Sequence, residues 1–276
     1  MTRRRWFLTV ILAPFLALQS ISLAYYIREQ RSLTAYVDSV ASPSLPPSEQ
    51  VKAVVMSLRD KQGDTTDAFF MCPLFGFLRP TPLQVIERGG DCADRARLTI
   101  TLLRLRGIHS SKWALYNSEG ESKHAVVEAD VESGKMVVDG LFGIWFPKPQ
   151  GGYYAIRELK ADPTILPRRI KELRAQNLQP GVAPLKFYPL DDYVYFHART
   201  INWKKSAPMR LSYWVLHHIL GQAVDDLARP AFVEEPPLMV IYGATGFEFV
   251  LIVGWLLVQR LRKRTAYPRT KNGTEG

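Results

Sequence analysis

Two long apolar runs lie near the ends of this 276-residue chain. The first extends from Trp6 to Ile27 without a charged residue, and the second from Leu238 to Val258 with one charged residue, Glu248. A helix needs roughly 20 apolar residues to cross a bilayer, and each run is about that long. We therefore predict a transmembrane helix within residues 1–28 and another within residues 237–259.

Positive charge flanks both apolar runs on their outer sides. Of the net charge of +10, Arg3, Arg4 and Arg5 supply +3 and the tail after Gln259 supplies +5, so the rest of the chain carries only +2. The positive-inside rule then places both termini in the cytoplasm and residues 28–237 outside it. This distribution favours a lipid bilayer as partner and argues against nucleic acid.

A cleaved export signal is the alternative for the first run. The sequence Ser22-Leu23-Ala24 could serve a signal peptidase, and "RRWFL" resembles a twin-arginine signal. We favour an uncleaved anchor, and both possibilities leave the central domain extracytoplasmic. In the second run, Glu248 is expected either to have a function or a pairing partner, or else to be protonated or to face the first helix. Gly243 and Gly246 are predicted to allow close packing of transmembrane helices, and the oligomeric state stays open.

Between the runs, the spacing of apolar residues predicts helices first, then strands, then helices. Val51, Val54, Val55 and Leu58 have helical spacing, and so does the stretch "GGDCADRARLTITLLRLRG" at 89–107. On that helix we expect Arg97, Thr101 and Arg104 to face solvent. Strands are predicted within 111–117, 124–131 and 135–146, and helices within 153–177 and 208–228.

This order of elements predicts an α+β fold between two transmembrane helices, with helices packed on an antiparallel sheet. The predicted boundaries are 1–28 for the first anchor, 29–50 for a linker, 51–177 for a catalytic domain, 178–236 for a membrane-proximal helical and aromatic segment, 237–259 for the second anchor and 260–276 for a basic cytoplasmic tail. Within 178–236, residues 191–203 are expected to pack rather than to line a substrate groove.

Three residues in this order could carry acyl-transfer chemistry. Cys92 begins a helix with Asp91 as its cap, His124 begins a strand, and Asp139 ends the next strand. A helix N-terminus favours a thiolate, an imidazole can exchange its proton, and a carboxylate fixes the imidazole tautomer. The backbone N–H of Cys92 is the expected oxyanion donor.

The strand pairing decides whether His124 reaches Asp139. A four-residue loop at 130–133 would place the two residues directly opposite each other, whereas a two-residue turn at Ser133-Gly134 would place Asp139 beside Glu128 and break the triad. We predict the four-residue loop or an equivalent bulge.

The stretches "GGDCADRARLTITLLRLRGI" and "KHAVVEADVESGKMVVDGLFG" resemble the core of the transglutaminase-like superfamily. The resemblance covers Ile86 to Phe146 and implies a papain-like fold with Cys92, His124 and Asp139 as the catalytic residues. Val126 stands where the family often has an aromatic residue, and Gly140 where proline is common. Gln84 is a candidate for the second oxyanion donor. Residues 150–276 lie outside the resemblance.

The predicted function is that of a membrane-anchored cysteine enzyme acting on peptide or amide bonds of a peptide or protein substrate through a thioester. Hydrolysis is favoured over amine transfer, and a non-catalytic envelope scaffold is the rival. A Cys72–Cys92 disulfide would disable Cys92, and we do not favour it. His217, His218, Asp225 and Asp226 do not form a convincing metal site, so we expect no metal and no cofactor.

Overall fold

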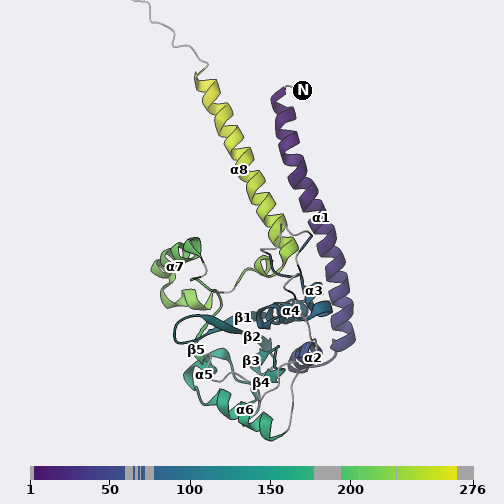
Figure 1. Cartoon of the computed structure of the whole chain (residues 1–276), viewed down its shortest axis with the longest axis vertical. Coiled ribbons are helices and arrows are strands. Elements are labelled where there is room, and N and C mark those ends of the chain that lie inside the picture. Colours follow the sequence, from purple (N-terminus) through teal and green to yellow (C-terminus); the bar gives the residue numbers. More distant parts are fainter. Residues whose placement is uncertain are drawn as a thin grey trace, which may run out of the picture. The chain divides into compact units, whose positions relative to one another are not determined.

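The structure is a computed structural model that describes residues 3–59, 65, 68, 70–71, 78–176, 194–204, 206–227 and 229–265. The chain divides into two compact units. One comprises residues 1–26 and 237–276, and we call it the apolar helical unit. The other comprises residues 27–236, and we call it the folded domain. Figure 1 shows the chain and its elements.

The apolar helical unit contains most of helix α1 (Arg3–Val40) and of α8 (Pro236–Thr265). Both helices are long and apolar enough to cross a membrane, with a mean hydropathy of 1.8 over their candidate spans. Within this unit, Gln19 Nε2 donates a hydrogen bond of 2.9 Å to Glu248 Oε2. Glu248 therefore faces the first helix, which is one of the alternatives that the sequence left open.

Two glycines of α8 do not lie at its contact with α1, and their role in packing between transmembrane helices of separate chains stays a prediction. Apart from the nearby backbone of α8 itself, no described atom lies within 4 Å of where a Cβ at Gly243 or Gly246 would stand. The contact between the two helices is made instead by larger side chains, including the rings of Phe15 and Phe247, whose centroids lie 5.0 Å apart.

The folded domain is built on a five-stranded antiparallel sheet with strand order β4-β3-β2-β1-β5 (Figure 1). The strands are β1 (Ser110–Tyr116), β2 (Ser122–Val131), β3 (Gly134–Asp139), β4 (Ile144–Trp145) and β5 (Val194–Arg199). The remaining helices are α2 (Pro47–Arg59), α3 (Pro82–Arg88), α4 (Cys92–Leu105), α5 (Ile156–Ala161), α6 (Ile165–Ala175) and α7 (Ala207–Leu220), with 3-10 helices η3 (Gly221–Asp226) and η4 (Ala231–Glu234). This arrangement confirms the predicted α+β class with an antiparallel sheet.

The sheet separates two apolar cores because side chains alternate between its faces. On one face, Ala125, Val127 and Ala129 of β2 pack with buried residues of α1, α2 and α4. On the other face, Val126 packs with buried residues of α5, α6 and β5. Helix α4 therefore lies against the middle of the sheet, and its first residue, Cys92, packs against the edge of the first core.

Residues 29–50 are not the linker that we predicted. Helix α1 continues without a break to Val40, and Leu33, Val37 and Ala41 are fully buried in the first core. Their spacing of four residues forms an apolar stripe on a helix that is otherwise polar here. The last turns of α1 are thus part of the folded domain.

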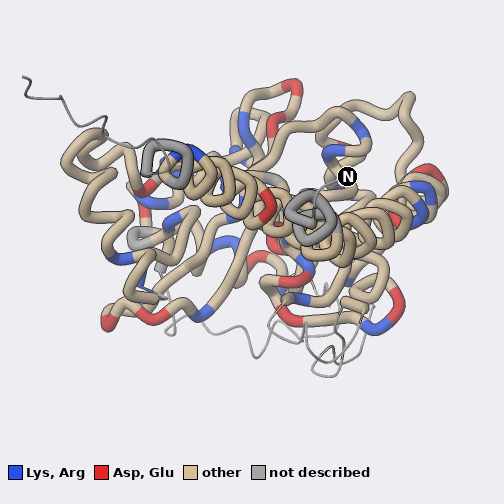
Figure 2. The backbone as a smooth tube through the Cα atoms, turned by 90° about the horizontal axis from the view of Figure 1, so that it is seen from above, with Lys and Arg blue, Asp and Glu red and all other residues tan. Residues whose placement is uncertain are grey.

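The sheet also extends beyond the predicted boundary at residue 177. Strand β5 pairs antiparallel with β1 within the aromatic segment that we expected only to pack. Helix 153–177 is in fact two short helices, α5 and α6, and α7 ends at Leu220 rather than near 228. Figure 2 shows that basic and acidic residues alternate along the backbone of the described chain without separating into two regions.

Candidate active site

Cys92 is the first residue of α4, where the helix has free backbone N–H groups. Asp91 is the N-cap, as predicted, and its Oδ1 accepts a hydrogen bond of 2.8 Å from the N–H of Asp94. Cys92 is a half-buried free thiol. Its sulfur therefore stands at the positive end of a 14-residue helix, and its own N–H is available as an oxyanion donor.

The glycine pair before Cys92 shapes the approach to the helix. Gly89 and Gly90 have φ values of +93° and +121°, a region that favours glycine. A Cβ on Gly90 would also stand 2.9 Å from Cβ of Asp94. Gly90 is therefore required both for the turn and for the close passage of the chain over the first turn of α4.

His124 and Asp139 form a buried hydrogen-bonded pair. His124 Nε2 donates to Asp139 Oδ2 at 2.7 Å, and the side chains are 4% and 0% exposed. The other carboxylate oxygen of Asp139 accepts from the N–H groups of Leu141 and Phe142 at 3.0 and 3.1 Å. Hydrogen bonds to both of its oxygens thus fix the Asp139 carboxylate in place. Because Nε2 of His124 is bonded to this carboxylate, Nδ1 is the imidazole nitrogen that can contact another group.

The register that brings this pair together differs from both registers that we considered. Strands β2 and β3 are joined through Glu132-Ser133, with Val131 paired to Gly134 and Val127 to Val138. Continuing this pairing puts Asp139 opposite Val126, so His124 is its diagonal neighbour on the same face. Diagonal side chains lie roughly 7–8 Å apart at Cβ, which long side chains can bridge. The predicted four-residue loop is wrong, yet the contact forms.

The side chain of Cys92 lies within hydrogen-bond reach of His124. Burial acts to lower the pKa of His124, but the Asp139 carboxylate and a side-chain hydrogen bond with Cys92 raise it from 6.5 to about 10. An imidazole in this position holds a proton at neutral pH. The structure thus brings Cys92, His124 and Asp139 together from α4, β2 and β3.

Gln84 lies in the capping box of α3 rather than in an evident oxyanion site. Its Oε1 accepts from the N–H of Thr81, and its own N–H donates to Thr81 Oγ1. The role of Gln84 as an oxyanion donor stays a prediction. A cation that we did not foresee, Arg79, pairs with the cap of α4: its Nη1 is 3.0 Å from Asp91 Oδ2. Burial acts to lower the pKa of Arg79, but the carboxylates of Asp91 and Asp94 outweigh this effect and raise it.

The predicted solvent-facing side of α4 is instead largely buried. Arg97 and Thr101 are almost fully buried because the chain around η4 covers them. Arg97 Nη1 is 3.2 Å from Asp94 Oδ1, and its Nη2 donates to the carbonyl of Glu234 at 2.8 Å. Arg104 pairs with the buried Glu235. The spacing of Asp94 and Arg97 by three residues was a sequence signal for part of this network.

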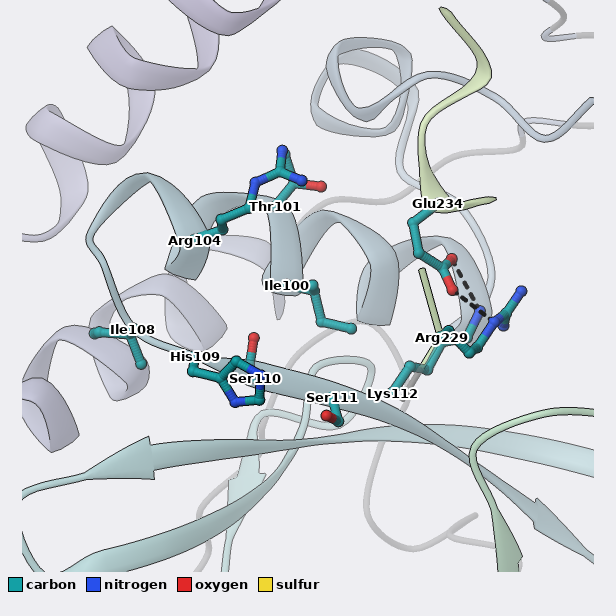
Figure 3. A pocket seen from close by; sticks show the side chains of 10 residues that line it. All are labelled: Ile100, Thr101, Arg104, Ile108, His109, Ser110, Ser111, Lys112, Arg229 and Glu234. Carbon is teal, nitrogen blue, oxygen red and sulfur yellow. Dashed lines mark hydrogen bonds and ion pairs between the residues drawn. The ribbon is translucent and has the colours of Figure 1, made fainter. Parts of the chain in front are cut away.

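A pocket of about 160 Å³ lies beside this network, between the later turns of α4 and the start of β1 (Figure 3). Glu234 joins Lys112 and Arg229 across it at 3.4 and 2.9 Å. Burial lowers the pKa of Lys112 to about 8. The pocket contains none of the three residues of the predicted triad, so it is separate from the candidate active site.

Within the described part of the chain, no group of three His, Cys, Asp or Glu side chains is placed to hold a metal ion. His218 Nδ1 lies 2.7 Å from the carbonyl of Trp214 on its own helix. Cys72 lies outside the described residues, so the structure does not bear on the disulfide that we considered.

Comparison with known proteins adds little to this picture. No family model matches the sequence, and no curated protein matches it significantly. One solved structure, described as a proposed protease from Parabacteroides distasonis, matches 46% of this chain with 15% identity and a TM-score of 0.31. The match spans only 25% of that chain. A likeness at this level does not establish a common fold.

Proposed function

We propose that this protein is a membrane-anchored cysteine enzyme that cleaves peptide or amide bonds outside the cytoplasm, through a papain-like core of the transglutaminase-like type. The observation that carries the proposal is the buried His124–Asp139 pair, joined to Cys92 at the start of α4. These are the nucleophile, the proton carrier and the orienting carboxylate that thiol acyl transfer requires.

In the proposed reaction, the thiolate of Cys92 attacks the carbonyl carbon of the substrate. The carbonyl oxygen becomes an oxyanion, which the N–H of Cys92 stabilises. Collapse of this intermediate breaks the carbon–nitrogen bond, and the leaving amine takes its proton from His124 Nδ1. The products of this half are a free amine and a thioester on Cys92, with a neutral imidazole.

In the second half, His124 accepts a proton from the attacking molecule, which adds to the thioester carbonyl. With water this step releases a carboxylic acid and restores the thiolate and imidazolium. Water is the default acceptor for a domain in an aqueous compartment, so hydrolysis is the proposed outcome. Asp139 keeps Nε2 protonated throughout and stabilises the imidazolium.

Mass spectrometry of the protein after incubation with a mixture of peptides tests this function. We expect an acyl adduct on Cys92 that disappears with time in water and is absent from Cys92→Ala. Addition of a primary alkyl amine distinguishes the outcomes, because an acyl group captured by the amine indicates transfer rather than hydrolysis. A Cys92→Ala variant that keeps the parent's peptide-cleaving activity would overturn the proposal in favour of a scaffold.

A further inference from the structure

Helix α7 carries apolar side chains on the face where a surface helix ordinarily carries polar ones. Leu211, Trp214, Val215 and Ile219 follow the spacing that puts residues on one helix face, and they are 64, 60, 42 and 71% exposed. No residue of α7 is buried. A face of this kind indicates a contact that the folded domain alone does not supply.

The other side of α7 is held by the domain. Met209, Tyr213 and Leu216 are half-buried, and the ring of Tyr213 lies 5.7 Å from that of the buried Trp203. Ser206 caps the helix by accepting a hydrogen bond from the N–H of Met209. The helix is therefore formed, and its apolar face points away from these contacts.

The charges around α7 select the chemistry of the partner. Helix α7 itself contains Arg210 and no Asp or Glu, and Lys204 and Lys205 precede it in sequence, whereas Arg199 is paired with Asp225 of η3 at 3.4 Å. Lys204 and Arg210 are exposed on the described surface. Basic residues beside exposed leucine, isoleucine and tryptophan are the composition of a helix that lies in a membrane interface, where tryptophan favours the headgroup level and cations attract anionic lipids.

The connection between α7 and α8 is short. Val224 and Glu235 are fully buried in the domain, and α8 begins directly afterwards at Pro236. Only the 15 residues from 221 to 235 separate the end of α7 from the beginning of α8. A short connection therefore joins α7 to a helix that is long and apolar enough to cross a membrane.

We propose that α7 docks on the extracytoplasmic surface of the membrane, with Leu211, Trp214 and Ile219 among the acyl chains and the neighbouring basic residues at anionic headgroups. The inference rests on the membrane anchoring in the proposed function and adds a third, monotopic contact. It would hold the catalytic domain in one orientation at the bilayer surface.

Lipid quenching of a fluorophore on α7 tests the proposal. The full chain, in a background with Cys72→Ser and Cys92→Ser, carries a single label through Ile219→Cys, and a matched variant carries it through Glu172→Cys on the exposed side of α6. Both are reconstituted into vesicles of phosphatidylcholine and phosphatidylglycerol that contain a nitroxide-bearing lipid. We expect the label at 219 to be quenched at least about threefold more than the label at 172.

Equal quenching at the two positions would overturn the proposal. A label at 219 that is shielded from aqueous iodide but not quenched by the nitroxide lipid would also overturn it, because protein rather than lipid would then cover α7. If the label at 219 is quenched as strongly in vesicles of phosphatidylcholine alone as in vesicles that also contain phosphatidylglycerol, the role of the basic residues is refuted. Alkaline extraction of the same vesicles tests the membrane anchoring separately, because it releases a protein bound only at the surface and leaves a transmembrane protein in the vesicles.

Discussion

Replacing Arg97 with methionine should be among the most destabilising single changes in the folded domain. The guanidinium is 4% exposed and donates to the carbonyls of Glu234 and Pro80 at 2.8 and 3.0 Å, besides pairing with Asp94. Methionine would fill much of the space but would leave these buried acceptors without the cation. Breaking a buried pair by removing one partner costs about 3–5 kcal/mol.

The lower end of this range applies here because Asp94 keeps other partners. Its Oδ2 accepts from Thr65 Oγ1 at 3.0 Å, and Arg79 lies 3.5 Å from its Oδ1. A loss of about 3 kcal/mol corresponds to a fall in unfolding temperature of about 6–12 °C for a domain of this size. Circular dichroism of the full chain in detergent measures this fall.

Two further variants make the test specific. Arg88→Met changes an exposed arginine of α3 in the same way and should alter the unfolding temperature by at most about 2 °C. Arg97→Lys keeps the charge but cannot form the forked contacts, so it should lie between the parent and Arg97→Met. If Arg97→Met unfolds at the same temperature as Arg88→Met, the buried network does not hold α4 as described.

Three other outcomes follow from the geometry. In chemical denaturation, Gly90→Ala should lose at least about 1 kcal/mol more free energy of unfolding than the control Gly134→Ala. Both glycines have φ above +110°, but only a Cβ at Gly90 meets another atom within 4 Å. Equal losses in the two variants would contradict this prediction. Burial acts to lower the pKa of His124, but Asp139 and Cys92 raise it from 6.5 to about 10, so the folded state binds this proton more tightly. The stability that protonated His124 contributes is fully present below pH 6.5 and is lost as the pH rises to 10. The difference in unfolding temperature between the parent and His124→Asn should therefore become smaller across that range. A difference that stays constant would refute this prediction. In the apolar helical unit, the Gln19–Glu248 hydrogen bond predicts a coupling of about 1 kcal/mol between Gln19→Leu and Glu248→Leu in unfolding by detergent, and strictly additive effects would speak against that contact.

Local signals made part of the candidate site predictable. Residues close together in sequence predict the helix that begins at Cys92 with Asp91 as its cap. They also predict the two strands that carry His124 and Asp139. The contact between His124 and Asp139 formed although the loop was predicted wrongly. A shift of the pairing by two residues keeps both side chains on the same face, and their lengths bridge a diagonal.

Contacts between distant segments were not predictable from local pattern. Arg97 and Thr101 have the polar character of an exposed helix face, yet both are buried, and Arg97 contacts the carbonyls of Pro80 and of Glu234, the latter more than 130 residues later. Strand β5 is short and aromatic and lacks a clear alternation, so its place in the sheet depends on pairing with β1. Likewise, the part of α1 that follows the first apolar run contains many polar residues, yet Leu33, Val37 and Ala41 are buried in the first core and Tyr36 and Val40 pack against it.

The central claim is that His124 activates Cys92 as a nucleophile. The most direct measurement is the rate at which a peptide bearing a thiol-reactive group modifies Cys92 at neutral pH, followed by intact mass spectrometry in the parent, His124→Ala and the exposed control His109→Ala. We predict a single adduct at Cys92 whose rate falls by at least about 100-fold in His124→Ala and stays at the parental value in His109→Ala. Equal rates in the parent and His124→Ala would contradict the claim.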